Sequence, residues 1–275
     1  MLVLIIGLLL FQEPAESVGH PDALTPPSET VKADADTGLK AVLPHLRIDR
    51  KRQFVDVDAT VVFARPDEAE PGSNLVAGQW LELVACTPGM RDYESLLAVK
   101  ARPSHIHQAL LMIGLVPGSP IRRVMTDEGQ SKVIAPRGPP VEVIVIIGTG
   151  PDACQIPINR WIIDRDSAKP LADHSWLFTG SAFAQVETRP VYLADLNGSV
   201  VTLVNFGDDL LARATTVTNR DDGMKWVANA KAIPAAGTEL VLRLMAAKNV
   251  EGGREGRKLR VGGESTVDSR KAVED

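Results

Sequence analysis

The stretch 85–115 contains four side chains that could bind a metal or take part in catalysis: Cys86, Glu94, His105 and His107. Thiolate, carboxylate and imidazole groups are the ligands that zinc and copper take in proteins. A cysteine beside a histidine can also serve as a nucleophile with its general base. Whether these residues form one site depends on the elements that carry them.

The residues around Cys86 and Glu94 predict a β-hairpin. Residues 80–86 and 93–99 have the composition of strands, and Thr87-Pro88-Gly89-Met90 fits a type II turn, with proline second and glycine third. Cys86 and Glu94 are then expected near the turn. The strand that follows carries the chain about 20 Å away before the histidines begin. This layout separates the thiol from both imidazoles and weakens the metal and nucleophile interpretations.

The histidines are expected in the first turn of a helix over 105–115, with Ser104 as its N-cap. Residues two apart on a helix point about 200° apart, so His105 and His107 cannot both bind one ion there. The bare amides of this helix end favour an anionic or carbonyl-bearing ligand and neutral imidazoles. We therefore expect any binding site to use Ser104, His105, His107 and Glu94. The alternative is a capped helix end with one packed histidine.

Cys86 and Cys154 are the only two cysteines. In an oxidising compartment they would be able to form a disulfide, while the alternative is two separate buried thiols. The segment 146–153 matches G-x-G-x-x-A after a strand, but Pro151 and Pro157 would break the helix that a dinucleotide site requires. We interpret this segment as a turn.

The acidic pairs are also expected in turns, because neither has the alternating spacing of a calcium loop; they are Asp208-Asp209 and Asp221-Asp222. The motifs G-x-S-x-G, H-E-x-x-H and C-x-x-C do not occur in the sequence. No complete catalytic set is therefore recognisable.

The composition is that of an ordinary globular protein, with 275 residues, 44% hydrophobic and 24% charged. A formal net charge of −5, scattered basic residues and only 4% aromatic residues argue against nucleic-acid binding. The chain is long enough to bury a substantial core.

The first residues indicate export. Residues 2–11 are an unbroken apolar run, about half of what a membrane-spanning helix needs, and small residues at Ala15 and Ser17 suit cleavage after Ser17. No lysine or arginine precedes the run, as one normally does in a signal peptide. The predicted organisation is a signal peptide over 1–17, a flexible linker over 18–44, one domain over 45–246 and a disordered tail over 247–275. The mature protein is expected in the periplasm or outside the cell, and not as an integral membrane protein.

Strand patterns dominate the domain. Residues 54–63 alternate apolar and polar side chains, and 141–147 is a continuous β-branched run typical of a strand buried on both faces. Asn197-Gly198 predicts a type I′ turn between two strands, and 213–228 a second hairpin. With 239–245 as a closing strand, the pattern predicts an α+β fold. We expect a largely antiparallel β-sheet with one or two packed helices in a single domain.

Three stretches of the sequence resemble the YdjY-domain proteins, an uncharacterised bacterial family with many exported members. They are LVACTPGMRDYESLLAVKARPSHIHQALLMIGLVPGSP, WLFTGSAF and LVNFGDDLLARATTV. The resemblance covers about 50–245 and implies one extracytoplasmic domain without an established activity. The family's Cys, Glu and His pattern falls here on Cys86, Glu94, His105 and His107, with no role established. Redox labels sometimes attach to the family, but an iron–sulfur cluster needs about four thiolates.

Two functions remain as hypotheses. The first is a non-enzymatic exported domain that binds a small ligand or an envelope protein and needs no cofactor. The alternative is a redox-linked or metal-dependent protein or enzyme, with copper or zinc held by Cys86, Glu94, His105 and His107.

Overall fold

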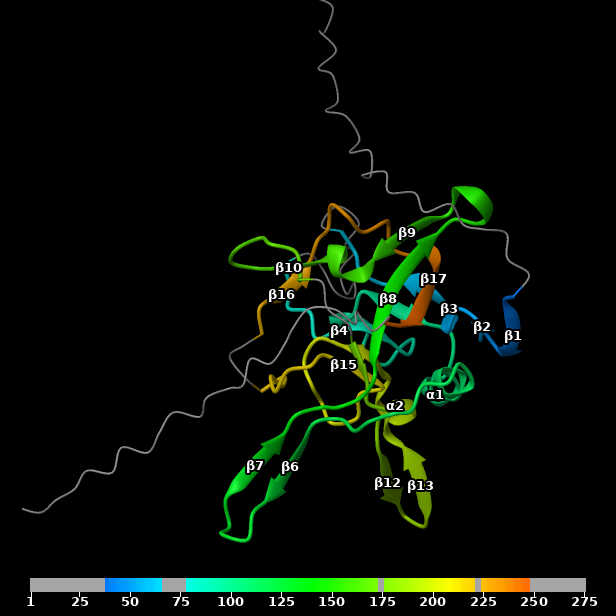
Figure 1. The fold of residues 1–275 in the computed structure, drawn as a ribbon. Coiled ribbons are helices and arrows are strands. Elements are labelled where there is room, and N and C mark those ends of the chain that lie inside the picture. The colour runs from blue at the N-terminus through cyan, green and yellow to red at the C-terminus, as the bar shows by residue number, and fades with distance from the viewer. Residues whose placement is uncertain (1–37, 66–77, 173–175, 221–223, 248–275) are drawn as a thin grey trace, which may run out of the picture.

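The computed structural model describes residues 38–65, 78–172, 176–220 and 224–247. Over these residues the protein is mostly β: an eight-strand mixed barrel with two short helices, in one body (Figure 1). The expected signal peptide, most of the expected linker and all but the first residue of the expected tail lie outside the described residues. Within the described part, no helix has both the length and the apolar character needed to cross a membrane.

The helices are α1 (Pro103–Met112) and α2 (Leu193–Asn197), with three short 3-10 turns at Asp92–Glu94, Gly150–Asp152 and Ile158–Trp161. The strands are β1 (Lys40–Leu43), β2 (Leu46–Asp49), β3 (Phe54–Val61), β4 (Leu83–Cys86), β5 (Leu97–Val99), β6 (Arg122–Met125), β7 (Ser131–Ile134), β8 (Pro140–Ile147), β9 (Cys154–Pro157), β10 (Ile162–Asp164), β11 (Trp176–Phe178), β12 (Phe183–Val186), β13 (Arg189–Tyr192), β14 (Ser199–Thr202), β15 (Leu211–Ala212), β16 (Trp226–Ala228) and β17 (Glu239–Ala246).

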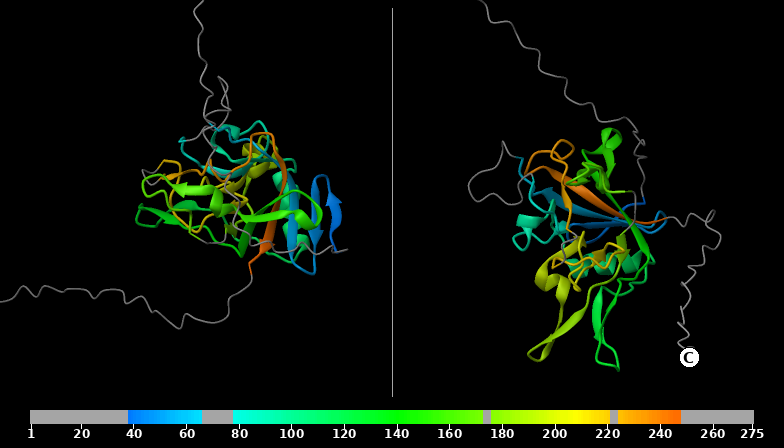
Figure 2. Two further views of the ribbon diagram at one scale, coloured as in Figure 1. Left: turned by 90° about the horizontal axis from the view of Figure 1, so that it is seen from above. Right: turned by 90° about the vertical axis from the view of Figure 1, so that its left-hand side faces the viewer.

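The barrel closes in the order β3-β17-β8-β11-β15-β14-β4-β5 and back to β3. Two of its neighbouring pairs, β14–β15 and β4–β5, are parallel, and the rest are antiparallel. β3 shares one edge between β2 and β5, and β8 shares one edge between β11 and β9. These branches attach β1, β2 and β9 to the outside of the barrel, as Figure 2 shows from two further sides.

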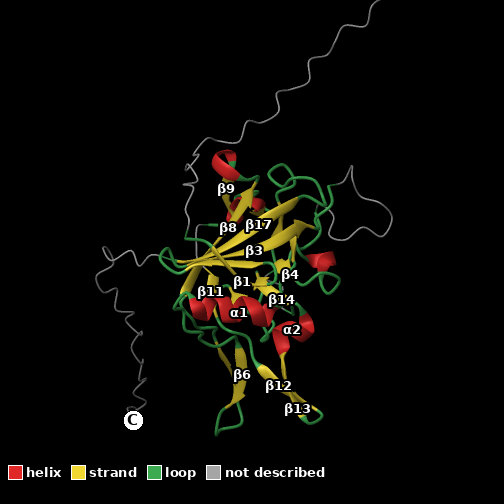
Figure 3. Ribbon diagram, turned by 90° about the vertical axis from the view of Figure 1, so that its right-hand side faces the viewer, coloured by secondary structure: helices red, strands yellow, loops and turns green. Residues whose placement is uncertain are grey.

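Alternating apolar side chains fill the barrel, which is why its long strands read with a period of two. Three eight-residue strands contribute most of these inward side chains, which are Val55, Val57, Ala59 and Val61, Val141, Val143 and Val145, and Leu240, Leu242 and Leu244. The expectation that β8 is buried on both faces is wrong, because Glu142 and Ile144 between the buried valines are partly exposed. α1 packs on β2 and β3, with Ile106, Ala109 and Leu110 buried (Figure 3).

The proportion of helix corrects the expected fold class. The two helices contain ten and five residues, so the protein is mainly β rather than α+β. β1 also lies inside the segment expected to be a flexible linker, where it pairs antiparallel with β2.

Neither hairpin expected in the second half of the chain forms. Asn197 ends α2, and Gly198 follows in the left-handed conformation with a φ of 75°, so the Asn-Gly pair terminates a helix. A helix end and a type I′ turn both need this positive φ, and the sequence alone does not separate them. β16, at the end of the second expected hairpin, pairs with β10 instead.

The hairpin expected around Cys86 is wrong as well. Its turn is present, since Gly89 has a φ of 74° and the Met90 amide donates to the Thr87 carbonyl at 3.2 Å. The 3-10 turn over Asp92–Glu94 then redirects the chain, and β5 runs parallel to β4. The hairpins β6–β7 and β12–β13 both extend from the side of the barrel that carries the helices (Figures 1 and 3).

Candidate functional site

Cys86 lies in β4 as a buried thiol. Its Sγ donates to the Asp92 carboxylate at 3.2 Å, and its side chain is fully shielded from solvent. Burial is the main cause that raises the pKa of Cys86 to about 12, and the nearby Asp92 contributes in the same direction. Nucleophilic and metal-binding cysteines need a lowered pKa, because the thiolate is the reactive form. The local chemistry at Cys86 therefore favours a structural thiol.

The two cysteines are separate and free. Cys86 belongs to β4, and Cys154 belongs to β9, which pairs with β8. In the closed order of the barrel, β4 and β8 lie opposite each other, with three strands between them in either direction. A disulfide needs Cα atoms within about 7 Å, so the structure does not allow the disulfide that the sequence left open.

The N-terminus of α1 is capped by a residue that the sequence did not indicate. Ser104 is not the N-cap, because the helix starts at Pro103 after Arg102. The Asp195 carboxylate of α2 accepts hydrogen bonds from the Ser104 amide at 2.7 Å and from the Ser104 hydroxyl at 2.6 Å. Arg102 pairs with the same carboxylate at 3.3 Å. Asp195 thus occupies the position that we expected an anionic ligand to take.

His107 is packed against aromatic side chains and is half-buried. Its Nδ1 lies 2.8 Å from the Tyr192 hydroxyl, and that hydroxyl donates to the Gly180 carbonyl at 3.0 Å. The Tyr192 hydroxyl has a single proton, which it donates to the Gly180 carbonyl. In the contact between His107 and Tyr192, Nδ1 is therefore the donor and carries a proton. The ring meets Phe178 edge to face, with centroids 5.1 Å apart. Burial lowers the pKa of His107, which favours the neutral ring that the sequence predicts.

Glu94 belongs to a different cluster, with Glu82 and Arg91. The Arg91 guanidinium pairs with both carboxylates and is 3.4 Å from Glu82 Oε2, and all three side chains are less than one-fifth exposed. The same guanidinium lies 3.8 Å from the centre of the Phe206 ring and 3.5 Å from Ser199 Oγ. Burial and the charge of Glu94 raise the pKa of Glu82 to about 7, although Arg91 lowers it. Sequence reasoning missed Glu82 and Arg91. Arg91 precedes Glu94 by three residues, whereas Glu82 joins them from the segment just before β4.

Replacing Glu82 by Gln is expected to change how stability depends on pH. The folded state holds the Glu82 proton up to a pKa of about 7, against an ordinary value of 4.5, so the folded state binds more protons than the unfolded state between these values. The wild-type protein therefore loses this contribution as the pH rises from 4.5 through 7. The variant, measured by urea unfolding at pH 5 and pH 8, should gain stability over the wild type at pH 8 and little at pH 5.

The wild type supplies the control for this measurement, because Asp209 acts in the same direction. Its pKa is raised to about 6 by burial and by the neighbouring Asp208. Both proteins retain Asp209, so the difference between the variant and the wild type isolates Glu82. An equal gain at both pH values would contradict the assignment.

The structure does not gather the predicted metal and ligand residues into one site. Cys86 contacts Asp92, Glu94 pairs with Arg91, and His107 contacts Tyr192, while His105 lies partly exposed on α1. Over the described ranges, no group of three or more His, Cys, Asp or Glu side chains is arranged to hold a metal ion.

A cavity of about 600 Å³ lies where the β6–β7 hairpin meets the loop 213–220; we call it the Asn205 cavity. Three arginines, a buried asparagine and several apolar side chains share its lining, which is Ile121, Arg122, Arg123, Val133, Asn205, Phe206, Thr216, Val217, Thr218, Asn219 and Arg220. A second cavity of about 330 Å³ shares Val217 with it and is lined mainly by Leu171, Leu203, Val204, Arg213 and Trp226.

Asn205 holds the loop 213–220, which contributes residues to both cavities. Its backbone amide donates to the Val217 carbonyl at 2.9 Å, and its side-chain Nδ2 donates to the Thr215 carbonyl at 2.7 Å. These carbonyl partners fix the orientation of the side-chain amide. Asn205 is 1% exposed, and its Oδ1 has no hydrogen-bond partner among the described residues. No motif in the sequence singles out Asn205, because its partners are backbone groups ten or more residues away.

The family model of the YdjY domain matches residues 46–245. Neither the curated proteins nor the solved structures contain a match to the chain.

Proposed function

This chain belongs to the YdjY-domain family, and from that premise we propose that it is an exported domain that binds a small molecule without transforming it. The observation that carries the proposal is the Asn205 cavity. Its volume of about 600 Å³ lies in the range of small-molecule sites. Polar side chains and apolar walls share its lining, which is the composition of a site that orients a ligand.

The side chains around the cavity favour binding over catalysis. The described part of its lining contains no carboxylate, thiol or imidazole group. General acid–base and nucleophilic catalysis mostly use such groups, placed within hydrogen-bond reach of the substrate. Its polar side chains are guanidinium, hydroxyl and amide groups, which bind and orient without exchanging protons near neutral pH.

Hydrogen bonds hold one side of the cavity in place. Asn205 holds the loop 213–220 through two of its carbonyls, and the buried Asp209 carboxylate accepts from the amides of Phe206 and Gly207 at 3.0–3.2 Å. A wall held in this way loses little conformational freedom on binding, so more of the contact energy remains as affinity.

The proposal is tested by a screen with a blocked cavity. The full chain is screened by thermal shift against neutral, cationic and anionic metabolites, together with Thr216→Trp, which places an indole in the cavity. Thr188→Trp on the exposed β12–β13 turn is the matched control. We expect compounds that stabilise the wild type and Thr188→Trp but not Thr216→Trp, and that mass spectrometry recovers unchanged. Failure to find any compound whose binding depends on position 216, or chemical turnover of the bound compounds, would overturn the proposal.

A further inference from the structure

We infer that the ligand of the Asn205 cavity is a phosphorylated small molecule, an inference that rests on the proposed function. The charge of the lining is its starting point. Arg122, Arg123 and Arg220 line the cavity, and the described lining contains no acidic side chain. The whole chain has a formal net charge of −5, whereas the lining residues that the structure describes carry only positive charge.

The three guanidinium groups are not used by the fold. None of them has an ion-pair partner among the residues that the structure describes, whereas Arg47, Arg91, Arg102 and Arg243 each pair with a carboxylate. Arg122 and Arg123 belong to β6, and Arg220 belongs to the loop on the other side of the cavity. Successive side chains on a strand leave opposite faces, so Arg122 and Arg123 approach the cavity from different sides of β6. Positive charges that line one space repel each other, and an anion bound there relieves that repulsion.

Phosphate suits this arrangement better than a single carboxylate. A phosphate monoester carries close to two negative charges near neutral pH on one compact group with three acceptor oxygens. Guanidinium groups bind such oxygens in pairs, with two parallel hydrogen bonds from one side chain. Arginines that approach from two segments can therefore share one phosphate.

The rest of the lining indicates an organic group attached to the phosphate. Ile121, Val133 and Phe206 provide apolar surface, and Arg91 stacks on the Phe206 ring at 3.8 Å. Apolar walls would not contribute to the binding of an inorganic phosphate ion. A cavity of about 600 Å³ also exceeds the space that one phosphate group fills, and an attached carbon skeleton would occupy the remainder.

The test uses isothermal titration calorimetry on the full chain at low salt. The probes are glucose 6-phosphate, inorganic phosphate, succinate and glucose. We expect glucose 6-phosphate to bind more tightly than the other three and glucose not to bind. Arg123→Gln and Arg220→Gln should each weaken binding of glucose 6-phosphate about tenfold, and the triple variant that includes Arg122→Gln should abolish it. Arg189→Gln, an exposed arginine on the other hairpin, is the matched control and should bind as the wild type does.

The outcomes separate this inference from the proposed function. Equal binding of succinate, or unchanged binding in the triple variant, would overturn the phosphate assignment. If a neutral compound then binds in a way that Thr216→Trp abolishes, the cavity is a ligand site and only the ligand class is wrong. If glucose 6-phosphate binds equally well to Thr216→Trp, its site is elsewhere and the inference fails.

The phosphate group has two sources, soluble metabolites and lipid headgroups. Flotation with vesicles of phosphatidylglycerol, and of phosphatidylcholine as the control for charge, distinguishes them. Binding to anionic vesicles that glucose 6-phosphate displaces and the triple variant loses would assign the headgroup of a lipid. Tight binding of glucose 6-phosphate without vesicle binding would assign a soluble phosphorylated compound.

Discussion

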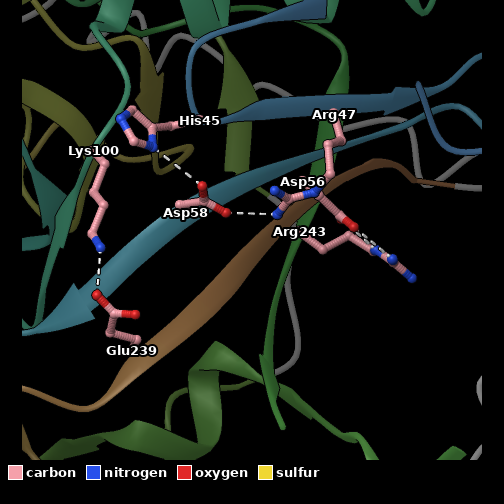
Figure 4. Close-up of polar contacts among 7 residues, drawn as sticks. All are labelled: His45, Arg47, Asp56, Asp58, Lys100, Glu239 and Arg243. Atoms are coloured by element: carbon pink, nitrogen blue, oxygen red, sulfur yellow. Dashed lines mark hydrogen bonds and ion pairs between the residues drawn. The ribbon is translucent and has the colours of Figure 1, made fainter. Parts of the chain in front are cut away.

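Replacing Arg243 by Met should lower the free energy of unfolding by about 3–5 kcal/mol, because it leaves the charge of Asp56 buried without a partner. Arg243 in β17 lies directly opposite Asp56 in β3. Its Nε and one terminal nitrogen donate to the two carboxylate oxygens at 2.7 and 2.9 Å (Figure 4). The Asp56 side chain is only 5% exposed, so water cannot replace the lost guanidinium.

The same guanidinium also packs on an aromatic ring. Its central carbon lies 3.8 Å from the centre of the Phe54 ring, on the same strand as Asp56 and two residues away. Methionine retains part of the contact with the ring but cannot neutralise the carboxylate. Asp56→Asn in the Arg243→Met background removes the unpaired charge and should recover part of the stability.

A partly exposed ion pair to the same strand provides the control. Arg47 in β2 donates to Asp58 at 2.7 Å, and both side chains are 31% exposed (Figure 4). Burial raises the pKa of Asp58, but hydrogen bonds from Arg47 and His45 lower it overall. Because water screens this pair, Arg47→Met should cost about 1 kcal/mol or less. Urea unfolding followed by tryptophan fluorescence measures both variants, and equal losses would refute the role given to burial.

Gly138→Ala should destabilise the protein by about 3 kcal/mol, at the upper end of what overpacking costs. A Cβ at position 138 would lie 2.2 Å from the carbonyl oxygen of Phe178. That backbone cannot move aside easily, because the Phe178 carbonyl accepts from the Gly118 amide and its amide donates to the Pro139 carbonyl, both at 2.9 Å. Gly138 lies at the base of the β6–β7 hairpin, so the clash would separate this hairpin from the barrel.

Gly129→Ala is the matched control in the turn of the same hairpin. Position 129 has open space around it but a φ of 76°, so alanine there meets backbone strain without a clash and should cost about 1–2 kcal/mol. Gly138 has no positive φ, and its whole expected cost comes from the close approach. Thermal unfolding of both variants gives the comparison. A smaller loss at 138 than at 129 would show that the backbone around Gly118, Gly138 and Phe178 can move apart at little cost.

Much of the local structure follows from the sequence alone. Period-two apolar patterns identify β3 and β17, because one face of each strand fills the barrel, and Pro88-Gly89 identifies its turn through backbone angles that few residues adopt. An apolar segment that begins with Pro103 identifies α1. These features depend on neighbours within a few positions, and a sequence displays such neighbours directly.

The tertiary structure alone decided which of these elements meet. Asp195 caps a helix 91 residues away in the chain, and Gly198 ends a helix rather than turning a hairpin. Glu82 acquires a raised pKa through its burial and the neighbouring charge of Glu94. Arg220 lies far from Arg122 and Arg123 in the sequence, yet all three line one cavity.

The sequence by itself therefore determined the family, the β-rich domain and its main strands, because repeating local patterns encode them. The closed barrel and the candidate site could not be predicted from such local patterns. They depend on strand pairing and on close contacts between residues far apart in the chain, such as Asn205 with the loop 213–220. Hydrogen bonds to backbone groups carry no residue signature in the partner, so only the folded chain reveals them.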